Sequence, residues 1–144
     1  MNPGVVIGLV VLALVMVIAV GITRPVNLTL TVADGRLVVE PRGFDVLMAQ
    51  RRRIEVPLDR VTDVRVVPRD EAPRAGLRLP GAYLPGVIVA GSYGLGAERT
   101  FWDVRRGDPV LVIRCAEGSP YRALVMEFAE PYSVLARVRG GLGD

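Results

Sequence analysis

The chain opens with a long apolar run before it changes to short alternating segments. Residues 4–22 contain 16 apolar residues and three glycines, with no charge, amide or hydroxyl group. As a helix, this run reaches roughly 28 Å, which matches the hydrocarbon core of a bilayer. A cleaved secretory signal, the alternative, would carry basic residues before a shorter apolar run. The pattern therefore predicts a retained transmembrane helix at 4–22, followed by a short linker at 23–26.

From residue 27 onwards, apolar and polar residues alternate along short segments. The three apolar side chains of residues 27–32 fall on one face, which is the pattern of a half-buried β-strand. The Asp-Gly pair at residues 34–35 is the preferred two-residue hairpin turn, because both positions need positive φ. We therefore expect residues 36–40 to return as the second strand of a hairpin.

The rest of the domain continues with short apolar segments separated by turns. Residues 45–50 fit either a strand or a helix, residues 68–78 have the composition of a loop, and residues 91–96 that of a flexible connection. Further strands are expected at residues 53–56, 62–67, 87–90, 100–104, 110–114 and 122–128.

The last segment changes from the period of a strand to that of a helix. Pro131 suits the first helical position, where its missing N–H costs no hydrogen bond. Val134, Leu135 and Val138 recur at helical spacing, and two glycines then end the segment. The sequence therefore predicts one mainly β domain (α+β) over residues 27–140. Its seven or eight strands would form a sandwich or a small barrel, with the helix plugging an open end.

Five motifs of this domain occur together: a strand pair at 54–64, a glycine–proline approach into a strand at 78–93, an aromatic strand at 101–104, a valine–isoleucine strand at 110–113 and a proline-started helix at 130–138. Together they resemble the bacterial pleckstrin-homology (PH) domain family. The resemblance implies a strongly bent β-barrel of about seven strands with a C-terminal helix, often tethered by membrane helices. It implies no reaction, because a fold does not define a function. The basic residues of the lipid-binding type would lie in the first hairpin loop, which here has only Arg36.

Composition limits the chemistry that this domain can perform. All 18 basic residues are arginine and histidine is absent, so the usual general base and the usual zinc ligand are missing. Cys115 is the single cysteine, which excludes an internal disulfide and a multi-cysteine metal site. The net charge of +3 is mild and spread out, so it does not indicate nucleic-acid binding. We predict a non-enzymatic domain without metal, cofactor or nucleic-acid partner.

The charges beside the apolar run predict on which side of the membrane the domain lies. Arg24, Arg36 and Arg42 follow the run, whereas only the terminal amine precedes it. The positive-inside rule therefore favours a single-pass protein of the cell membrane with a cytoplasmic C-terminal domain.

Arg51, Arg52 and Arg53 form the densest positive group of the chain. One interpretation places them against anionic lipid headgroups, where each basic residue is worth about 1 kcal/mol. The alternative, which we favour on sequence alone, is a solvated turn between two elements.

Two other groups are candidate contact sites. The aromatic and apolar residues around the glycine–proline turns suggest a surface for a protein partner, namely Tyr83, Leu84, Tyr93 and Trp102. Phe101 and Trp102 point to opposite faces of a regular strand, so one of the two is expected to be exposed. Gly4 and Gly8 have the small-residue spacing of a helix–helix contact, which would allow a homo-oligomer.

The function predicted from these features is a membrane-tethered module that docks a protein partner and catalyses no reaction. Peripheral binding of anionic lipid headgroups is the alternative. The two differ in whether the arginine group or the aromatic group makes the functional contact.

Overall fold

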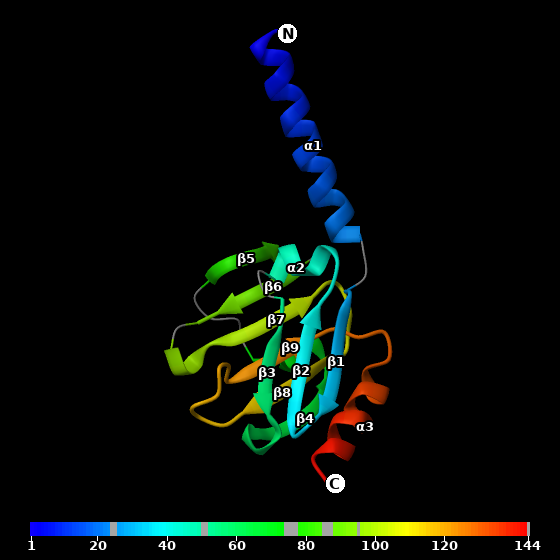
Figure 1. The fold of residues 1–144 in the computed structure, drawn as a ribbon. Coiled ribbons are helices and arrows are strands. Elements are labelled where there is room, and N and C mark those ends of the chain that lie inside the picture. The colour runs from blue at the N-terminus through cyan, green and yellow to red at the C-terminus, as the bar shows by residue number, and fades with distance from the viewer. Residues whose placement is uncertain (24–25, 50–51, 74–77, 85–87, 95, 144) are drawn as a thin grey trace.

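The computed structural model describes residues 1–23, 26–49, 52–73, 78–84, 88–94 and 96–143 (Figure 1). It begins with helix α1 (Pro3–Thr23), which stands apart from the rest of the molecule. The side chains from Met1 to Val20 are exposed all round the helix, and none of them joins a core. Helix α1 is therefore long and apolar enough to cross a membrane, as expected, although a signal sequence has the same properties.

The strands form two sheets in the described part of the chain. The first is an antiparallel sheet of three strands in the order β1-β2-β3. The second has six strands in the order β4-β8-β9-β7-β6-β5, and all its neighbours are antiparallel except β7 and β9. The bounds are β1 Leu28–Ala33, β2 Arg36–Pro41, β3 Ile54–Pro57, β4 Val61–Val67, β5 Arg78–Leu84, β6 Ile88–Tyr93, β7 Thr100–Val104, β8 Val110–Cys115 and β9 Ala123–Met126.

The expected closed barrel is wrong, whereas the α+β class is confirmed. The six-stranded sheet ends at β4 and β5, which do not pair with each other, and neither pairs with the three-stranded sheet in the described residues. The physical reason lies in β9, which returns from β8 and inserts between β8 and β7. The spacing of turns along a sequence does not reveal such an insertion.

Local patterns were more informative about the elements themselves. Asp34 and Gly35 have φ values of 54° and 71°, and Ala33 pairs with Arg36, so the predicted two-residue hairpin is confirmed. The ambiguous segment at 45–50 is helix α2 (Phe44–Ala49). The expected loop at 68–78 contains a 3-10 turn, η2 (Arg69–Glu71), and Arg78 already belongs to β5. Further 3-10 turns are η1 (Leu58–Arg60) and η3 (Gly96–Glu98). Strand β6 extends as far as Tyr93, and thus into the segment 91–96 that was expected to be a flexible connection.

Helix α3 (Pro131–Gly141) covers the opening between the two sheets, with Pro131 in its first turn as predicted. Val134 and Val138 are buried in the core cluster that both sheets share. On the same helix, Arg137 Nη1 donates to the carbonyl of Leu30 in β1 at 3.3 Å, and Arg139 Nη2 donates to that of Val64 in β4 at 3.2 Å. The helix thus satisfies backbone acceptors at the outer strands of both sheets, where unpaired groups invite aggregation.

A second apolar cluster covers the other face of the six-stranded sheet. It is formed by Tyr93, Trp102, Val104, Val110, Val112 and Val125. Phe101 belongs to the first cluster, so neighbouring residues of β7 are buried on opposite faces. The expectation that either Phe101 or Trp102 would be exposed is therefore wrong, because β7 is a central strand that is covered on both sides.

Candidate functional site

Strand register defines one end of the domain, which we call the anchor-proximal end. It holds the start of β1, the end of β2, helix α2 and the start of β3, because Leu28 pairs with Pro41 and Val39 pairs with Ile54. The chain arrives here from α1, as Figure 1 also shows. Arg42 N–H donates to the carbonyl oxygen of Asn27 at 2.9 Å, which places Arg42 beside the arriving chain.

The arginines at this end differ in how strongly acidic residues hold them. Arg53 forms ion pairs with Glu55 at 2.6 Å and with Glu40 at 3.5 Å. Arg42 lies 3.9 Å from Glu40 and donates from Nε to the hydroxyl of Thr29. Arg52 is exposed and has no ion pair or hydrogen bond in the described residues. Arg51, also predicted to contact lipid, lies outside the described residues.

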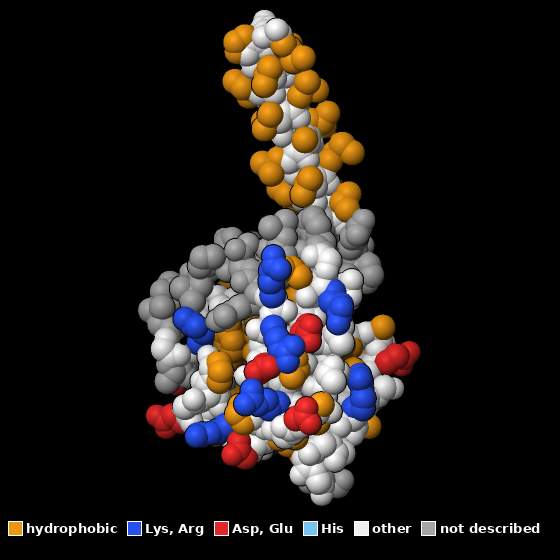
Figure 2. Space-filling view, viewed as in Figure 1, with side chains coloured by type: hydrophobic (Ala, Val, Ile, Leu, Met, Phe, Trp, Pro, Cys, Tyr) orange, Lys and Arg blue, Asp and Glu red, His pale blue; other side chains and the backbone are white. Residues whose placement is uncertain are grey.

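The outward face of β1–β3 carries positive and negative side chains in close mixture (Figure 2). Arg36 pairs with Glu55 at 3.0 Å, next to the Arg53–Glu55 pair. The hydrogen bond and the charge of Arg53 lower the pKa of Glu55 below its ordinary value. This face also forms an open depression of about 540 Å³. Its two arginines pair with Glu40 and Glu55, and Asp34 also lines it, so the depression offers no surplus of positive charge.

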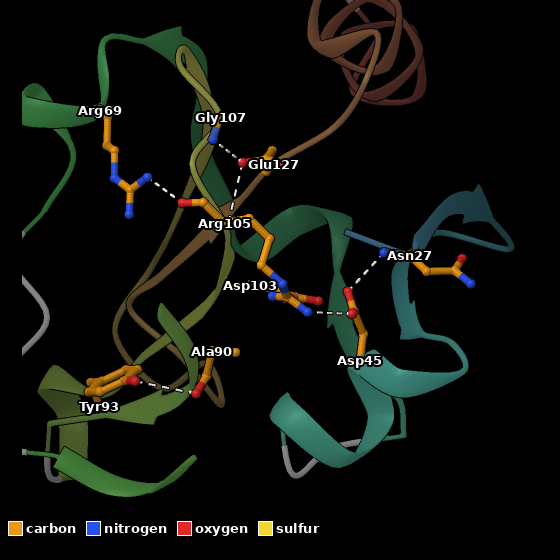
Figure 3. Close-up of polar contacts among 9 residues, drawn as sticks. All are labelled: Asn27, Asp45, Arg69, Ala90, Tyr93, Asp103, Arg105, Gly107 and Glu127. Atoms are coloured by element: carbon orange, nitrogen blue, oxygen red, sulfur yellow. Dashed lines mark hydrogen bonds and ion pairs between the residues drawn. The ribbon is translucent and has the colours of Figure 1, made fainter. Parts of the chain in front are cut away.

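A buried ionic cluster lies behind this end of the sheet (Figure 3). We call it the Asp45–Asp103–Arg105 cluster, and its three residues are only 1%, 0% and 3% exposed. Arg105 donates from Nη2 to Asp45 Oδ1 at 2.6 Å and from Nη1 to Asp103 Oδ1 at 3.0 Å. The guanidinium therefore joins α2, which supplies Asp45, to β7, which supplies Asp103.

The two carboxyl groups of the cluster are in different surroundings. Burial raises the pKa of Asp103 well above its ordinary value, and the neighbouring Asp45 acts in the same direction, against the opposing effect of Arg105. Asp103 Oδ2 and Arg105 Nε have no hydrogen-bond partner among the described residues. A neutral Asp103 reduces the number of charges buried in the cluster, which lowers the desolvation cost.

The backbone around Arg105 ties the cluster to the rest of the six-stranded sheet. Glu127 Oε1 accepts from Arg105 N–H at 3.2 Å and also from Gly107 N–H. Glu127 N–H in turn donates to the carbonyl of Asp103 at 3.0 Å, and Arg69 Nη1 donates to that of Arg105. These contacts, most of them drawn in Figure 3, hold Arg105 from β7, from the segment after β9 and from η2.

Two of the residues predicted to form a partner surface do not lie on the surface. Tyr93 is 1% exposed and Trp102 is 6% exposed, because both belong to the second apolar cluster. Their prediction as surface contacts is therefore wrong. Tyr83 and Leu84 lie in β5, but their side chains are outside the described residues. Gly4 and Gly8 lie in the first turns of α1, and their proposed helix–helix contact stays a prediction.

Groups with catalytic or metal-binding chemistry are sparse in the part of the chain that the structure describes. It contains no group of three or more Cys, Asp, Glu or His residues that could hold a metal ion. Burial raises the pKa of the Cys115 thiol to about 11, so the nucleophilic thiolate is a very small fraction near neutral pH.

Sequence reasoning missed the Asp45–Asp103–Arg105 cluster. The signal that could have found it is Asp103, a charged residue in a strand whose other members are mostly apolar. Such a residue needs a buried partner. Asp45 is the other carboxylate that Arg105 binds. It lies 58 positions before Asp103 in the chain and was not identifiable from spacing.

The chain matches no protein-family model, no curated protein and no solved structure. The resemblance to the PH domain family therefore stays a prediction from the motifs.

Proposed function

We propose that the protein is a membrane-tethered, non-enzymatic domain whose anchor-proximal end contacts anionic lipid headgroups. In this proposal α1 is a single transmembrane anchor and Arg52 is the principal lipid contact. The observation that carries the proposal is that Arg42, Arg52 and Arg53 lie at the end of the domain that the chain enters from α1. The resemblance to membrane-tethered PH-like domains, which implies no reaction, agrees with this.

The length of the linker supports contact with the headgroup layer. Four residue steps separate Thr23, the last residue of α1, from Asn27. They extend to roughly 14 Å at most. A headgroup layer is about 6 Å thick, and the surface potential reaches about one Debye length, roughly 8 Å, beyond it. The anchor therefore keeps this end of the domain within reach of the charged surface.

The pairing of the arginines decides which of them is available to lipid. Arg53 pairs with Glu55 and Glu40, and Arg42 lies beside Glu40, so a phosphate must compete with these carboxylates. Arg52 has no such competitor in the described residues. A lone basic residue near an anionic surface contributes about 1 kcal/mol, which corresponds to about fivefold in partitioning.

Vesicle sedimentation tests the proposal with the domain alone, residues 26–144. Neither apolar cluster includes a residue of α1, so we expect this fragment to fold, which circular dichroism verifies. We expect the fragment to bind phosphatidylcholine vesicles only when they contain phosphatidylglycerol. The Arg52→Ala variant should bind these vesicles about fivefold more weakly.

Arg114→Ala is the matched control. Arg114 is also exposed and has no ion pair in the described residues. In the strand register of β4 and β8 it lies opposite Asp63, near the start of β4 and away from the anchor-proximal end. If both variants lose binding equally, the effect reflects net charge and not this site. If the wild-type fragment binds equally with and without phosphatidylglycerol, the lipid proposal is rejected. Docking of a protein partner, the other function that the sequence suggests, would then take its place.

A further inference from the structure

We infer that the Asp45–Asp103–Arg105 cluster is a clamp that fixes the chain arriving from α1, and with it the direction in which the anchor-proximal end faces. Asp45 is the positioning residue in this device. The inference rests on the proposed function, since a fixed direction matters most if that end of the domain meets the membrane.

Asn27 is the residue on which the clamp acts. Its N–H donates to Asp45 Oδ2 at 2.8 Å, and its carbonyl accepts from Arg42 N–H at 2.9 Å. Both backbone groups of Asn27 are thus held, four positions after the end of α1 and before β1 begins. The side chain of Asn27 is exposed, so side-chain packing does not hold this residue in place.

Asp45 is held in turn by the core. Its second oxygen, Oδ1, accepts from Arg105 at 2.6 Å, and Arg105 is held by Asp103 in β7. The chain of contacts runs from Asn27 through Asp45 and Arg105 into a strand that is buried on both faces. Figure 3 shows the same path from Asn27 to Asp103.

The energetics of buried ions argue that this cluster serves arrangement more than stability. Replacing a buried ionic triad by apolar residues of similar volume is often neutral or stabilising, because the charges lose their hydration. Here Asp103 Oδ2 and Arg105 Nε also lack partners, which adds to the cost. What an apolar replacement cannot supply is the acceptor for Asn27 N–H. The cluster is therefore suited to fixing the arriving chain.

The same contacts fix the arginines. Asp45 lies in the first turn of α2, and the chain continues from α2 towards Arg52 and Arg53 at the start of β3. Holding α2 against β7 while holding Asn27 against α2 fixes the point where the chain enters the domain relative to these arginines. Without the clamp, the linker would allow the domain to turn its basic end away from the bilayer.

Amide hydrogen exchange by NMR of the full-length chain in detergent micelles tests the clamp without any lipid charge. The first variant is Asp45→Asn, and the second is the triple variant Asp45→Leu, Asp103→Leu and Arg105→Met, which keeps similar volumes if the single change prevents folding. We expect the Asn27 amide to exchange at least tenfold faster in the triple variant, while the amides of β8 and β9 keep their wild-type protection. Asp59→Asn, an exposed residue of η1, should change neither.

The inference would be overturned if the exchange rate of the Asn27 amide were unchanged in a triple variant whose β8 and β9 amides keep their protection. A second measurement separates the clamp from the lipid proposal. In nanodiscs, phosphatidylglycerol should slow exchange at Arg52 and Arg53 in the wild type and in Asp59→Asn, but not in the triple variant. The Asn27 amide could exchange faster in the clamp variants while phosphatidylglycerol has no effect on exchange at Arg52 and Arg53 in the wild type. This result would support the clamp and reject the lipid function.

Discussion

Arg105 holds two carboxyl groups, those of Asp45 and Asp103, in different surroundings. Asp45 accepts hydrogen bonds from Arg105 and from the backbone N–H of Asn27, so each of its two oxygens has a partner. Asp103 Oδ1 accepts only from Arg105, Oδ2 is unpartnered, and burial together with the neighbouring Asp45 raises its pKa. The neutral form of Asp103 is therefore the one that the fold stabilises.

This difference predicts how stability depends on pH. The folded-state pKa of Asp103 lies well above the ordinary value of 3.8, so the folded protein binds more protons than the unfolded chain above that pH. The contribution of Asp103 to the free energy of unfolding therefore falls as pH rises from about 3.8 through the folded-state pKa. Asp103→Asn resembles the neutral acid and should remove this decline. Urea denaturation at a series of pH values measures the effect.

Asp45→Asn is the informative comparison for Asp103→Asn. It replaces a carboxyl partner of Arg105 with a neutral amide and should reduce the free energy of unfolding by about 3 kcal/mol near neutral pH, the cost expected for breaking a buried ion pair. Equal destabilisation by Asp103→Asn at neutral pH would show that Asp103 is charged in the folded state, contrary to this account.

At the scale of elements, the β1–β2 hairpin is the clearest case of local sequence chemistry deciding structure. Its two turn residues both have positive φ, and an aspartate tolerates that conformation at the first of them. A Cβ at Gly35 would meet no atom within 4 Å, so space is not the reason for glycine there. Backbone conformation is the reason.

Gly35→Ala should therefore destabilise the protein by about 1 kcal/mol through backbone strain alone. Gly140→Ala is the matched control, because a Cβ at Gly140 also meets no atom within 4 Å but Gly140 lies in helix α3. The control should be neutral or stabilising, since alanine is the better helix former. Thermal unfolding of both variants checks this, and an unchanged midpoint for Gly35→Ala would contradict the role assigned to the turn.

At the scale of the whole molecule, α1 is the feature that the rest of the fold does not explain. No described residue of α1 from Pro3 to Val20 is buried, although nearly all are apolar. A surface of this kind needs a covering, and a bilayer covers a helix on all sides. A cleaved signal sequence would instead leave the protein after export.

Expression of the full chain in bacteria separates these alternatives. We expect the protein to sediment with membranes, to resist extraction by alkaline carbonate and to dissolve in detergent. Mass spectrometry of the extracted protein should find residues 4–22 intact. A soluble product that begins after residue 22 would show that the apolar run is a signal sequence, and the anchoring role of α1 would be lost.

Local patterns in the sequence were sufficient for the apolar helix, the hairpin at residues 34–35, several strands and helix α3. Each depends on the periodicity of neighbouring residues or on a turn that needs particular φ values. The aromatic surface was the main error in the predicted site, since Tyr93 and Trp102 are buried in the second apolar cluster and Trp102 lies on β7, a strand that is buried on both faces. A strand of this kind has no alternation from which its outward side could be recognised.

Only the tertiary structure decided the insertion of β9 beside β7, the open arrangement of two sheets and the meeting of Asp45 with Arg105. These contacts join residues far apart in the chain, and their free energy depends on burial, which a local pattern does not record. The arginine group shows both levels at once. Its charge was evident from the sequence, whereas the register of β1, β2 and β3 placed it where the chain arrives from α1 and left Arg52 without an acidic partner in the described residues.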